Sequence, residues 1–413
     1  MLEDEYALKV EIEGRRWGDH LKVEDSGDWN AWIDHPLVAA HYNTRGLIDG
    51  LAWADWVRKQ FGGPATRSLD LGCGAGNRSI AVFLAGASSF IEGIDVSEER
   101  VARATQVAQN LGINGQFTIG DANNQALPPN RFDLIFSCHS FHHFLNLEHI
   151  MEQVHNALTP RGFFILEEYV GPTQLQWTDH QIALVRSCLS LMPTRLRTYR
   201  SGVLKAEEAR PTTEQVVAVS PFESIRSSEI FPLFSRYFKL VAVKRLGGTI
   251  QHLLYNGIIH NFLPGDAEAM RSMESIFSLE DALIDGELLP SDFMILVGTR
   301  RDSPPLRRAD PAEIAAVLRA RIADLEREAR NLLSRVASYE QAILELRAQV
   351  EEKNQTINSV TGQLRARENE IDRMKNTLGG RLLGLFGPIK YRYVLPLLRA
   401  LGVAPRDSAP RKR

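Results

Sequence analysis

The feature that most constrains the fold of this chain is a short apolar run that leads directly into a glycine-rich turn. Residues 67–76 read RSLDLGCGAG, in which Leu69 and Leu71 predict a short buried strand. Three glycines follow, and glycine lets a backbone turn sharply and approach a ligand that a Cβ would repel. Residues 77–84 then predict a helix whose first amides face the bound molecule. The segment therefore indicates a nucleotide-binding loop.

Acidic residues stand at the ends of three successive predicted strands. Asp70 lies in the loop, an apolar run over residues 90–95 ends in Asp95, and Asp121 follows a predicted strand over residues 116–119. A carboxylate at the end of the second strand is placed to accept both hydroxyls of a ribose. The first loop contains no basic residue to hold a pyrophosphate, so the acids favour a nucleoside ligand without phosphates. A dinucleotide such as NAD is the alternative.

This pattern resembles the class I S-adenosylmethionine-dependent methyltransferases. The resemblance implies a Rossmann-like α/β fold with a doubly wound, mostly parallel sheet of seven strands, and S-adenosyl-L-methionine as the cofactor. It also implies that Asp95 holds the ribose and that Asp121, with the amide of Ala122, contacts the adenine. The residues that the resemblance assigns to the cofactor are Asp70, Gly72, Cys73, Gly74, Gly76, Asp95, Val96, Asp121, Ala122 and Ser137.

Four more apolar runs extend the predicted sheet. Residues 132–137 and 162–169 match the fourth and fifth strands, and residues 158–162 read as the end of the intervening helix because they contain a proline and a glycine. The runs over 237–243 and 293–297 resemble the antiparallel sixth and seventh strands of the family. Because strands alternate with helices, ligands are expected at the carboxyl ends of the strands. The methyl acceptor should therefore lie after the fourth and fifth strands.

Three histidines follow the fourth strand in the sequence CHSFHHF. Methyl transfer to a hydroxyl requires removal of its proton, and imidazole is ionisable near neutral pH. His142 and His143 are therefore the predicted catalytic bases, with packing beneath the cofactor as the alternative, and His139 is assigned to the acceptor. No metal site is predicted, because no second set of histidines and carboxylates occurs at ligand spacing.

Further polar residues are assigned to the acceptor. Glu168 ends the predicted fifth strand, and Arg226 would pair with an anionic group of the acceptor unless it forms an ordinary surface ion pair. His252, Asn256 and His260 recur at intervals of four, which would place them on one face of a helix. Such a face either lines a sugar pocket or is simply exposed to solvent.

The order of these motifs predicts a methyltransferase domain with additions. Residues 1–61 are expected to form an N-terminal helical lid, and residues 62–300 the α/β domain with helical cap insertions at about 171–232 and 247–291. The three cysteines are odd in number and widely spaced, so neither a disulfide framework nor a zinc site is indicated. The acidic start and the absence of long apolar runs predict a cytoplasmic protein.

The composition changes after a predicted linker over residues 301–311. From residue 318 onward apolar residues recur at alternating intervals of four and three, interrupted by Lys353 and Arg367. This spacing predicts a left-handed coiled coil over residues 312–378, and β-branched residues alternating with leucine favour a parallel homodimer. A helix from residue 318 to residue 378 would be roughly 90 Å long. An isolated solvated helix is the alternative, but it would not need such a seam.

Residues 379–413 form a basic tail. They contain eight Lys or Arg residues and the single acid Asp407, so the tail carries a charge of +7, against −10 for the remainder and −3 for the whole chain. Apolar residues are interleaved with the basic ones, which suits the surface of an anionic membrane better than nucleic acid. The tail is therefore expected to hold the protein at the inner face of the cytoplasmic membrane as a peripheral protein.

Residues 15–300 also resemble bacterial methyltransferases that are associated with surface polysaccharide synthesis. That resemblance implies O-methylation of a sugar or sugar phosphate in a lipid-linked or cell-surface glycan. One alternative is methylation of a small hydrophobic metabolite or lipid. A second is a non-catalytic coiled-coil scaffold with a degenerate fold, but the intact acids Asp70, Asp95 and Asp121 disfavour it because a site without a cofactor would not need all three.

Overall fold

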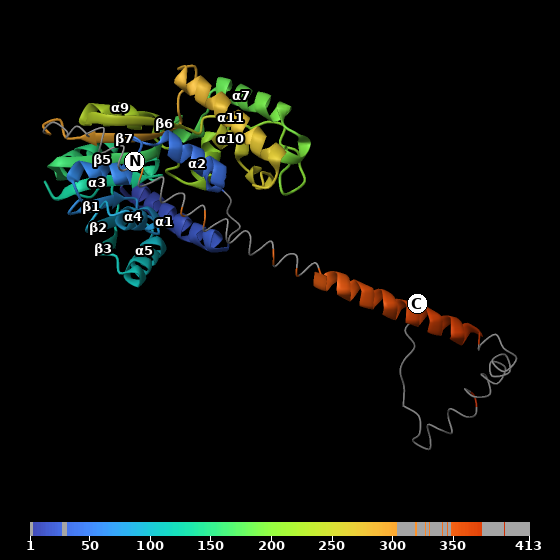
Figure 1. Ribbon diagram of the computed structural model, residues 1–413. Coiled ribbons are helices and arrows are strands. Elements are labelled where there is room, and N and C mark those ends of the chain that lie inside the picture. The colour runs from blue at the N-terminus through green and yellow to red at the C-terminus, as the bar shows by residue number, and fades with distance from the viewer. Residues whose placement is uncertain are drawn as a thin grey trace. The chain divides into compact units, whose positions relative to one another are not determined.

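The structure, a computed structural model, describes residues 3–26, 31–303 and 348–373 and the single positions 319, 327, 330, 341, 345 and 392. The chain divides into two compact units, Met1–Leu318 and Arg319–Arg413. The first unit contains a sheet and the helices that pack on it (Figure 1).

Seven strands form this sheet. They are β1 (Ser68–Leu71), β2 (Ile91–Asp95), β3 (Gly115–Ile119), β4 (Phe132–Cys138), β5 (Leu158–Tyr169), β6 (Lys239–Gly247) and β7 (Phe293–Thr299). Their spatial order is β3-β2-β1-β4-β5-β7-β6. The first five strands are parallel, and β7 runs antiparallel to both β5 and β6. The predicted Rossmann-like, mostly parallel sheet is therefore confirmed, with the reversal confined to β7.

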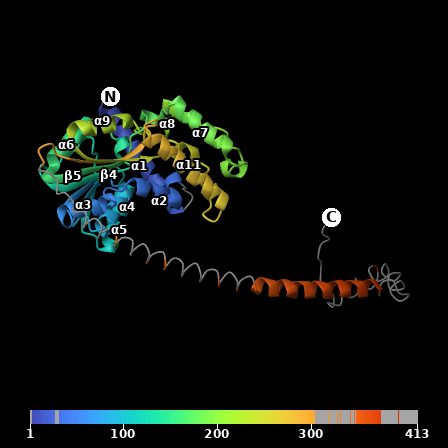
Figure 2. The same ribbon diagram turned by 45° about the horizontal axis from the view of Figure 1, so that its top comes forward.

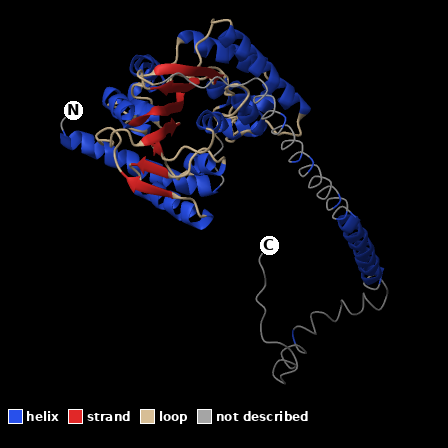
Figure 3. Cartoon of the chain, turned by 60° about the vertical axis from the view of Figure 1, so that its left-hand side comes forward, coloured by secondary structure: helices blue, strands red, loops and turns tan. Residues whose placement is uncertain are grey.

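Helices cover both faces of the sheet (Figure 3). One face packs against α3 (Trp53–Phe61), α4 (Asn77–Leu84) and α5 (Glu98–Leu111). The other face packs against α6 (Leu147–Ala157) and α9 (Ser227–Tyr237). This doubly covered sheet is the arrangement expected when strands and helices alternate along a chain.

The central strand β4 shows how the sequence produces this arrangement. Successive side chains of a strand point to opposite faces, so a strand covered on both sides is apolar at consecutive positions. Leu134 and Phe136 pack toward α3, where the rings of Phe136 and Trp53 lie 5.5 Å apart. Ile135 joins the cluster beneath α6 and α9. Fully burying each of these side chains contributes roughly 1.5–3 kcal/mol to folding.

One strand boundary differs from the prediction made from the sequence. The sequence indicates a helix end over residues 158–162, but β5 begins at Leu158, directly after α6. Pro160 lacks an amide hydrogen, yet a strand accepts proline near its first residues or at an irregularity in pairing. The register of β4 against β5 shifts between Phe132 and Leu134, beside this segment. The proline therefore marks the irregular start of a strand.

The expected N-terminal and cap regions are helical. α1 (Glu3–Ser26) packs on α5, and α2 (Pro36–Arg45) packs beside β6. Three further helices, α7 (Asp179–Leu191), α10 (Gln251–Tyr255) and α11 (Ala267–Asp285), lie together on the β6 side of the sheet (Figures 1 and 2). The remaining elements are η1 (Trp32–Asp34), η2 (Phe141–His143), η3 (Thr173–Leu175), η4 (Thr194–Arg197), α8 (Thr213–Val219) and η5 (Ile259–Asn261).

In the second unit, residues 348–373 form a continuous helix. Four apolar side chains recur on it every seven residues and are 50–60% exposed: Val350, Ile357, Leu364 and Ile371. Apart from residues 301–303 and the single positions given above, the rest of the predicted linker, coiled coil and basic tail lies outside the described residues. Among the helices that the structure describes, none is long and apolar enough to span a bilayer.

Candidate active site

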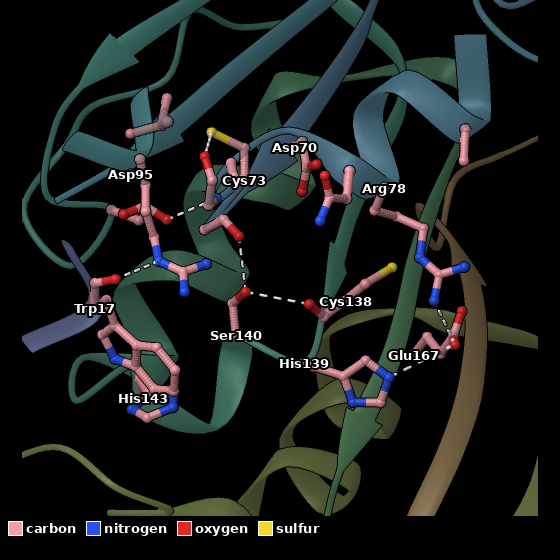
Figure 4. Close-up of a pocket in the computed structure, with 18 of the residues that line it drawn as sticks. Trp17, Asp70, Cys73, Arg78, Asp95, Cys138, His139, Ser140, His143 and Glu167 are labelled. Carbon is pink, nitrogen blue, oxygen red and sulfur yellow. Dashed lines mark hydrogen bonds and ion pairs between the residues drawn. The ribbon is translucent and has the colours of Figure 1, made fainter. Parts of the chain in front are cut away.

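A cavity of about 640 Å³ opens at the carboxyl ends of β1, β2 and β4 (Figure 4). Of the residues assigned to the cofactor, Asp70, Gly72, Cys73, Gly74, Asp95, Val96 and Ala122 line it, whereas Gly76, Asp121 and Ser137 do not. His139 and His143 also line it, but His142, Glu168, Arg226, His252 and Asn256 do not. The cavity therefore joins the glycine-rich loop to part of the histidine segment.

The glycine-rich loop lies against the turn that follows β4. Gly72 has φ +73°, and a Cβ added there would lie 2.4 Å from the Cβ of Ser140. Its amide donates to the carbonyl of Ile94 at 2.8 Å, and its carbonyl accepts from the Ser140 hydroxyl at 2.7 Å. Only glycine fits this close, left-handed turn. The loop is thereby fixed between β2 and β4, with its backbone facing the cavity.

Two residues predicted to contact the cofactor hold the loop from behind. Gly76 caps α4 with φ +80°, and a Cβ there would lie 2.9 Å from the Cβ of Ala104 on α5. The buried hydroxyl of Ser137 donates to the carbonyl of Leu71 at 2.7 Å. Both residues position the strand and loop without lining the cavity.

Asp95 ends β2 and lines the cavity. One carboxylate oxygen accepts from the amide of Gly74 at 2.8 Å, and the other accepts from the amide of Ser97 at 2.9 Å. Burial raises the pKa of Asp95, while these two amides counteract part of that rise. A carboxylate has about four acceptor positions, so Asp95 retains capacity for two ligand hydroxyls.

Helix α1 closes one side of the cavity. The Tyr6 hydroxyl donates to Asp121 at 2.7 Å, and the side chain of Arg100 donates to the carbonyl of Trp17 at 2.7 Å. Trp17 and Ala122 line the cavity, whereas Asp121 is turned toward α1 and the asparagines that follow it. The acid predicted to read adenine therefore anchors the N-terminal helix in this structure.

Opposite Asp95, a second charged group centres on Glu167 (Figure 4). This buried carboxylate accepts from Arg78 at 2.8 Å and from the indole of Trp53 at 3.0 Å, and a ring nitrogen of His139 lies 3.7 Å away. Burial alone would raise the pKa of Glu167, but Arg78 and His139 lower it to about 2. The sequence reasoning missed Arg78 and Glu167, although Glu167 falls at the carboxyl end of the predicted fifth strand.

His139 is held in an unusual backbone conformation at the cavity wall. Its φ is +54°, a region that costs a non-glycine residue about 1 kcal/mol or more. The backbone amide donates to the carbonyl of Glu167 at 2.9 Å, and the ring stands beside Tyr42 and Phe293. Strain of this kind is common at sites that orient a side chain toward a ligand. His139 is thus directed into the part of the cavity away from Asp95.

His142 belongs to η2 and points away from the cavity. Its Nδ1 lies 2.5 Å from a carboxylate oxygen of Glu168. Glu168 is fully buried and also accepts from the amides of Ser140, Phe141 and Tyr169. The carboxylate assigned to the acceptor is therefore occupied by protein groups.

His143 lines the cavity beside Trp17, with the two rings in an edge arrangement 5.3 Å apart. Its Nδ1 forms an ion-pair contact of 3.0 Å with Glu13, and its Nε2 lies 3.8 Å from Glu223. Burial alone would lower the pKa of His143, but Glu223 and Glu13 outweigh it and raise the pKa to about 9. The surroundings therefore favour a positive charge at this position, which opposes proton acceptance near neutral pH. The assignment of His142 or His143 as the base stays a prediction.

The remaining residues assigned to the acceptor lie elsewhere. Arg226 forms ion pairs with Glu148 at 2.7 Å and Glu229 at 2.6 Å. These contacts link the first turns of α6 and α9 and correspond to the alternative of an ordinary ion pair.

The predicted helix face at positions 252, 256 and 260 is wrong. α10 ends at Tyr255, and Gly257 has φ +72°, so the chain leaves the helix before position 260. His252 is half-buried among aromatic rings, stacked 5.8 Å from Trp32, and loss of solvation lowers its pKa to about 4. Asn256 follows the helix, and its carbonyl accepts from the buried Lys205 ammonium at 2.8 Å.

Residues 63–201 match a protein family described as a methyltransferase domain. Similar curated proteins include the 27-O-demethylrifamycin SV methyltransferase of Amycolatopsis mediterranei, 30% identical over 167 residues. They also include a sterol 24-C-methyltransferase of Gibberella zeae, 31% identical over 246 residues. The two matches cover 40% and 53% of this chain and 57% and 60% of the respective relatives. The chain thus spans less than two thirds of the length of either relative.

Similar solved structures include an S-adenosylmethionine-dependent methyltransferase from Mesorhizobium loti, with 19% identity and a TM-score of 0.36, covering 60% of this chain and 98% of that one. The geranyl diphosphate C-methyltransferase of Streptomyces coelicolor A3(2) has 11% identity and a TM-score of 0.38, covering 60% and 77%. The family match spans the glycine-rich loop, Asp95 and the histidine segment. Residues 63–201 therefore match a methyltransferase domain, the class of enzyme for which S-adenosyl-L-methionine was expected as the cofactor.

Proposed function

We propose that this protein transfers a methyl group from S-adenosyl-L-methionine to a hydroxyl of a polar acceptor of the sugar class. The observation that carries the proposal is one continuous cavity with two chemically different ends. The donor end consists of Gly72, Cys73, Gly74, Asp95, Val96 and Ala122, and the acceptor end of Asp34, Tyr42, Asn43, Arg78, His139 and Glu167. A methyl donor and its acceptor need to meet in one enclosed space.

The donor end fits the cofactor in shape and charge. S-adenosyl-L-methionine, when bound, supplies a methyl group activated by a sulfonium. The side-chain-free backbone at Gly72 and Gly74 admits a ligand close to the loop, and Asp95 is oriented by two amides to accept ribose hydroxyls. Burial raises the pKa of Asp70 to about 7, and the Ser79 hydroxyl holds this carboxyl at 2.6 Å. Asp70 therefore supports the loop.

The acceptor end supplies the groups that a hydroxyl substrate needs. His139 is the histidine that faces this end, where it would hold the acceptor hydroxyl or take its proton. Glu167 stabilises the positive charge that His139 would then carry, and Arg78 and Trp53 hold Glu167 in place. Sugar recognition relies on hydrogen bonds of the type that Asn43 can donate and accept.

A hydrophobic acceptor is the second candidate, because the similar proteins are named for methylating rifamycin and sterol substrates. Ile33 and Ala39 add an apolar wall to the acceptor end, which supports such a substrate. The excess of polar and charged side chains at this end favours the sugar acceptor.

The regions outside the methyltransferase domain extend the proposal. We propose that the C-terminal helix forms a parallel homodimer, since the exposed stripe from Val350 to Ile371 has the seven-residue period of a coiled-coil seam. The basic tail over residues 379–413 would bind the inner face of the cytoplasmic membrane and bring the enzyme to a lipid-linked glycan. Removing residues 379–413 should then shift the protein from the membrane fraction to the soluble fraction.

The direct test is methyl transfer with labelled S-adenosyl-L-methionine and two acceptors, a sugar phospholipid and a quinone-like lipid. The proposal expects label on the sugar phospholipid, with a lower rate for the His139→Ala variant. Label on the quinone-like lipid alone would favour the hydrophobic acceptor. Transfer to neither acceptor nor to any component of a cell lysate, by protein that binds S-adenosylhomocysteine, would contradict the proposal.

A further inference from the structure

Two imidazoles and a carboxylate converge behind the wall of the cavity, where His143 is the one of the three that lines it. His142 and His143 are consecutive residues of η2, and Glu223 comes from the turn between α8 and α9. The Nε2 of each histidine lies 3.8 Å from an oxygen of Glu223. One ligand atom from each of the three residues lies within 4.8 Å of the others.

Each histidine is oriented by a further carboxylate on its other nitrogen. The Nδ1 of His142 lies 2.5 Å from Glu168, and the Nδ1 of His143 lies 3.0 Å from Glu13. Carboxylates in this position fix the ring and leave the Nε2 lone pair for a metal ion. Both rings therefore present the same nitrogen toward Glu223.

The carboxylates are themselves held by the surrounding structure. Three backbone amides bind Glu168, as described above. Glu13 accepts from the indole of Trp17 and from the hydroxyl of Ser220, both at 2.7 Å, and Glu223 accepts from the hydroxyl of Ser224 at 2.9 Å. The group is thus assembled in advance from α1, η2, β5 and the turn before α9, as expected of a binding site with a supporting shell.

The negative charge of the three carboxylates favours a cation at this place. Three carboxylates, of which Glu13 and Glu168 are buried, surround two imidazoles. Protonating both imidazoles would offset two of the three negative charges, but their ring centres lie only 4.3 Å apart, so the two positive charges would repel each other. A divalent cation supplies the same charge between the Nε2 atoms and leaves both rings neutral.

We propose that His142, His143 and Glu223 bind one divalent transition-metal ion. Imidazole nitrogens with one carboxylate suit zinc, iron or manganese, whereas calcium and magnesium prefer oxygen ligands alone. Three protein ligands leave coordination positions open. Because His143 lines the cavity beside Trp17 and His142 and Glu223 do not line it, the ion would sit behind the cavity wall at that point. The sequence indicated no metal because the carboxylates come from three distant segments.

The test is zinc binding by the full chain after metal is removed by dialysis against a chelator. Calorimetric titration of wild-type protein with Zn²⁺ should show one ion per chain. Glu223→Gln and His143→Asn should each weaken zinc binding by at least about 10-fold, as loss of a ligand requires. His260→Asn changes a partly exposed histidine and Glu207→Gln an exposed carboxylate, and neither residue lines the cavity, so both variants should leave zinc binding unchanged.

Two results would overturn the proposal. One is no zinc uptake by wild-type protein, and the other is equal zinc affinity in wild type, Glu223→Gln and His143→Asn. Far-ultraviolet circular dichroism and the urea-unfolding midpoint, measured on wild type and each variant, establish that each variant is folded. The zinc titration measures ion binding and not methyl transfer. Failure of the proposed methyl transfer would therefore leave the zinc site supported, and absence of zinc binding would leave the proposed methyl transfer untouched.

Discussion

The donor end of the cavity is made mostly of backbone from two consecutive strand–turn segments, at Gly72–Gly74 and Asp95–Val96. The acceptor end is made of side chains from segments far apart in sequence, including Tyr42, Arg78 and Glu167. Backbone turns depend on local sequence, whereas side-chain pairs depend on the whole fold. Changes at the donor end should therefore alter folding and cofactor binding together, and changes at the acceptor end should alter turnover or acid stability.

The largest effect is expected at Gly72. Gly62 and Gly72 share nearly the same φ, +72° and +73°, but an added Cβ meets nothing within 4 Å at Gly62 and meets Ser140 at 2.4 Å at Gly72. Gly62→Ala should cost about 1–2 kcal/mol of unfolding free energy for the left-handed backbone. Gly72→Ala should cost more than about 3 kcal/mol, since the clash is added. Urea unfolding measures both, and equal losses would contradict the close approach of the loop to β4.

The ion pair between Arg78 and the buried Glu167 should give the next largest effect. Burial alone would raise the pKa of Glu167, but Arg78 and His139 lower it to about 2, below the unfolded value of about 4.3. A lowered folded-state pKa stabilises the fold above about pH 5, and that stability is lost as the pH falls toward 2. Glu167→Gln should therefore lose on the order of 2–3 kcal/mol at pH 7 and less at pH 3, measured by urea unfolding.

An exposed ion pair of the same length provides the control for this change. Arg186 and Glu207 also lie 2.8 Å apart, but both side chains are about 60% exposed. Glu207→Gln should change the unfolding free energy by less than about 1 kcal/mol at either pH. Equal losses of unfolding free energy in Glu167→Gln and Glu207→Gln would show that burial of Glu167 does not strengthen its ion pair.

Replacing His139 should change turnover and leave cofactor binding unchanged. His139→Ala should lower kcat about 100-fold, the usual contribution of a positioned proton-transfer group, and leave S-adenosylhomocysteine affinity unchanged. His260→Ala, which changes a partly exposed histidine outside the cavity lining, should change neither quantity. A normal kcat would show that His139 does not act on the acceptor. A parallel loss of S-adenosylhomocysteine affinity would show that its effect is not specific to the acceptor end.

The smallest effect is expected at Arg226, whose ion pairs with Glu148 and Glu229 are partly exposed. Arg226→Ala should cost less than about 1 kcal/mol and leave the acceptor KM unchanged. A 10-fold rise in that KM would restore the sequence-based hypothesis that Arg226 contacts the acceptor.

The sheet and the donor end could be predicted because their signals are local. The alternation of strands and helices and the glycine-rich turn indicated the mostly parallel sheet and the loop, and α4 has the expected bounds Asn77–Leu84. The prediction at Pro160 was wrong because proline ends helices but is also accepted near the start of a strand. Local sequence alone does not separate these two cases.

The acceptor end could be predicted only in part because its geometry comes from tertiary contacts. The histidine segment was found, but its spacing does not show that His139 faces the cavity while His142 turns toward Glu168. Nor does it show that Glu13 and Glu223 approach His143 from segments more than 70 residues away. The helix at position 252 was extended too far because the left-handed turn at Gly257 was missed.

Calorimetric titration of S-adenosylhomocysteine into the full chain tests whether the glycine-rich loop and Asp95 hold the methyl donor. Binding of one ligand per chain is expected, and Asp95→Ala should weaken it by the roughly 1–3 kcal/mol that charge-assisted hydrogen bonds contribute, whereas Asp55→Ala, on the exposed surface of α3, should not. Absence of binding to the wild-type chain at millimolar ligand, or full affinity in Asp95→Ala, would contradict the account.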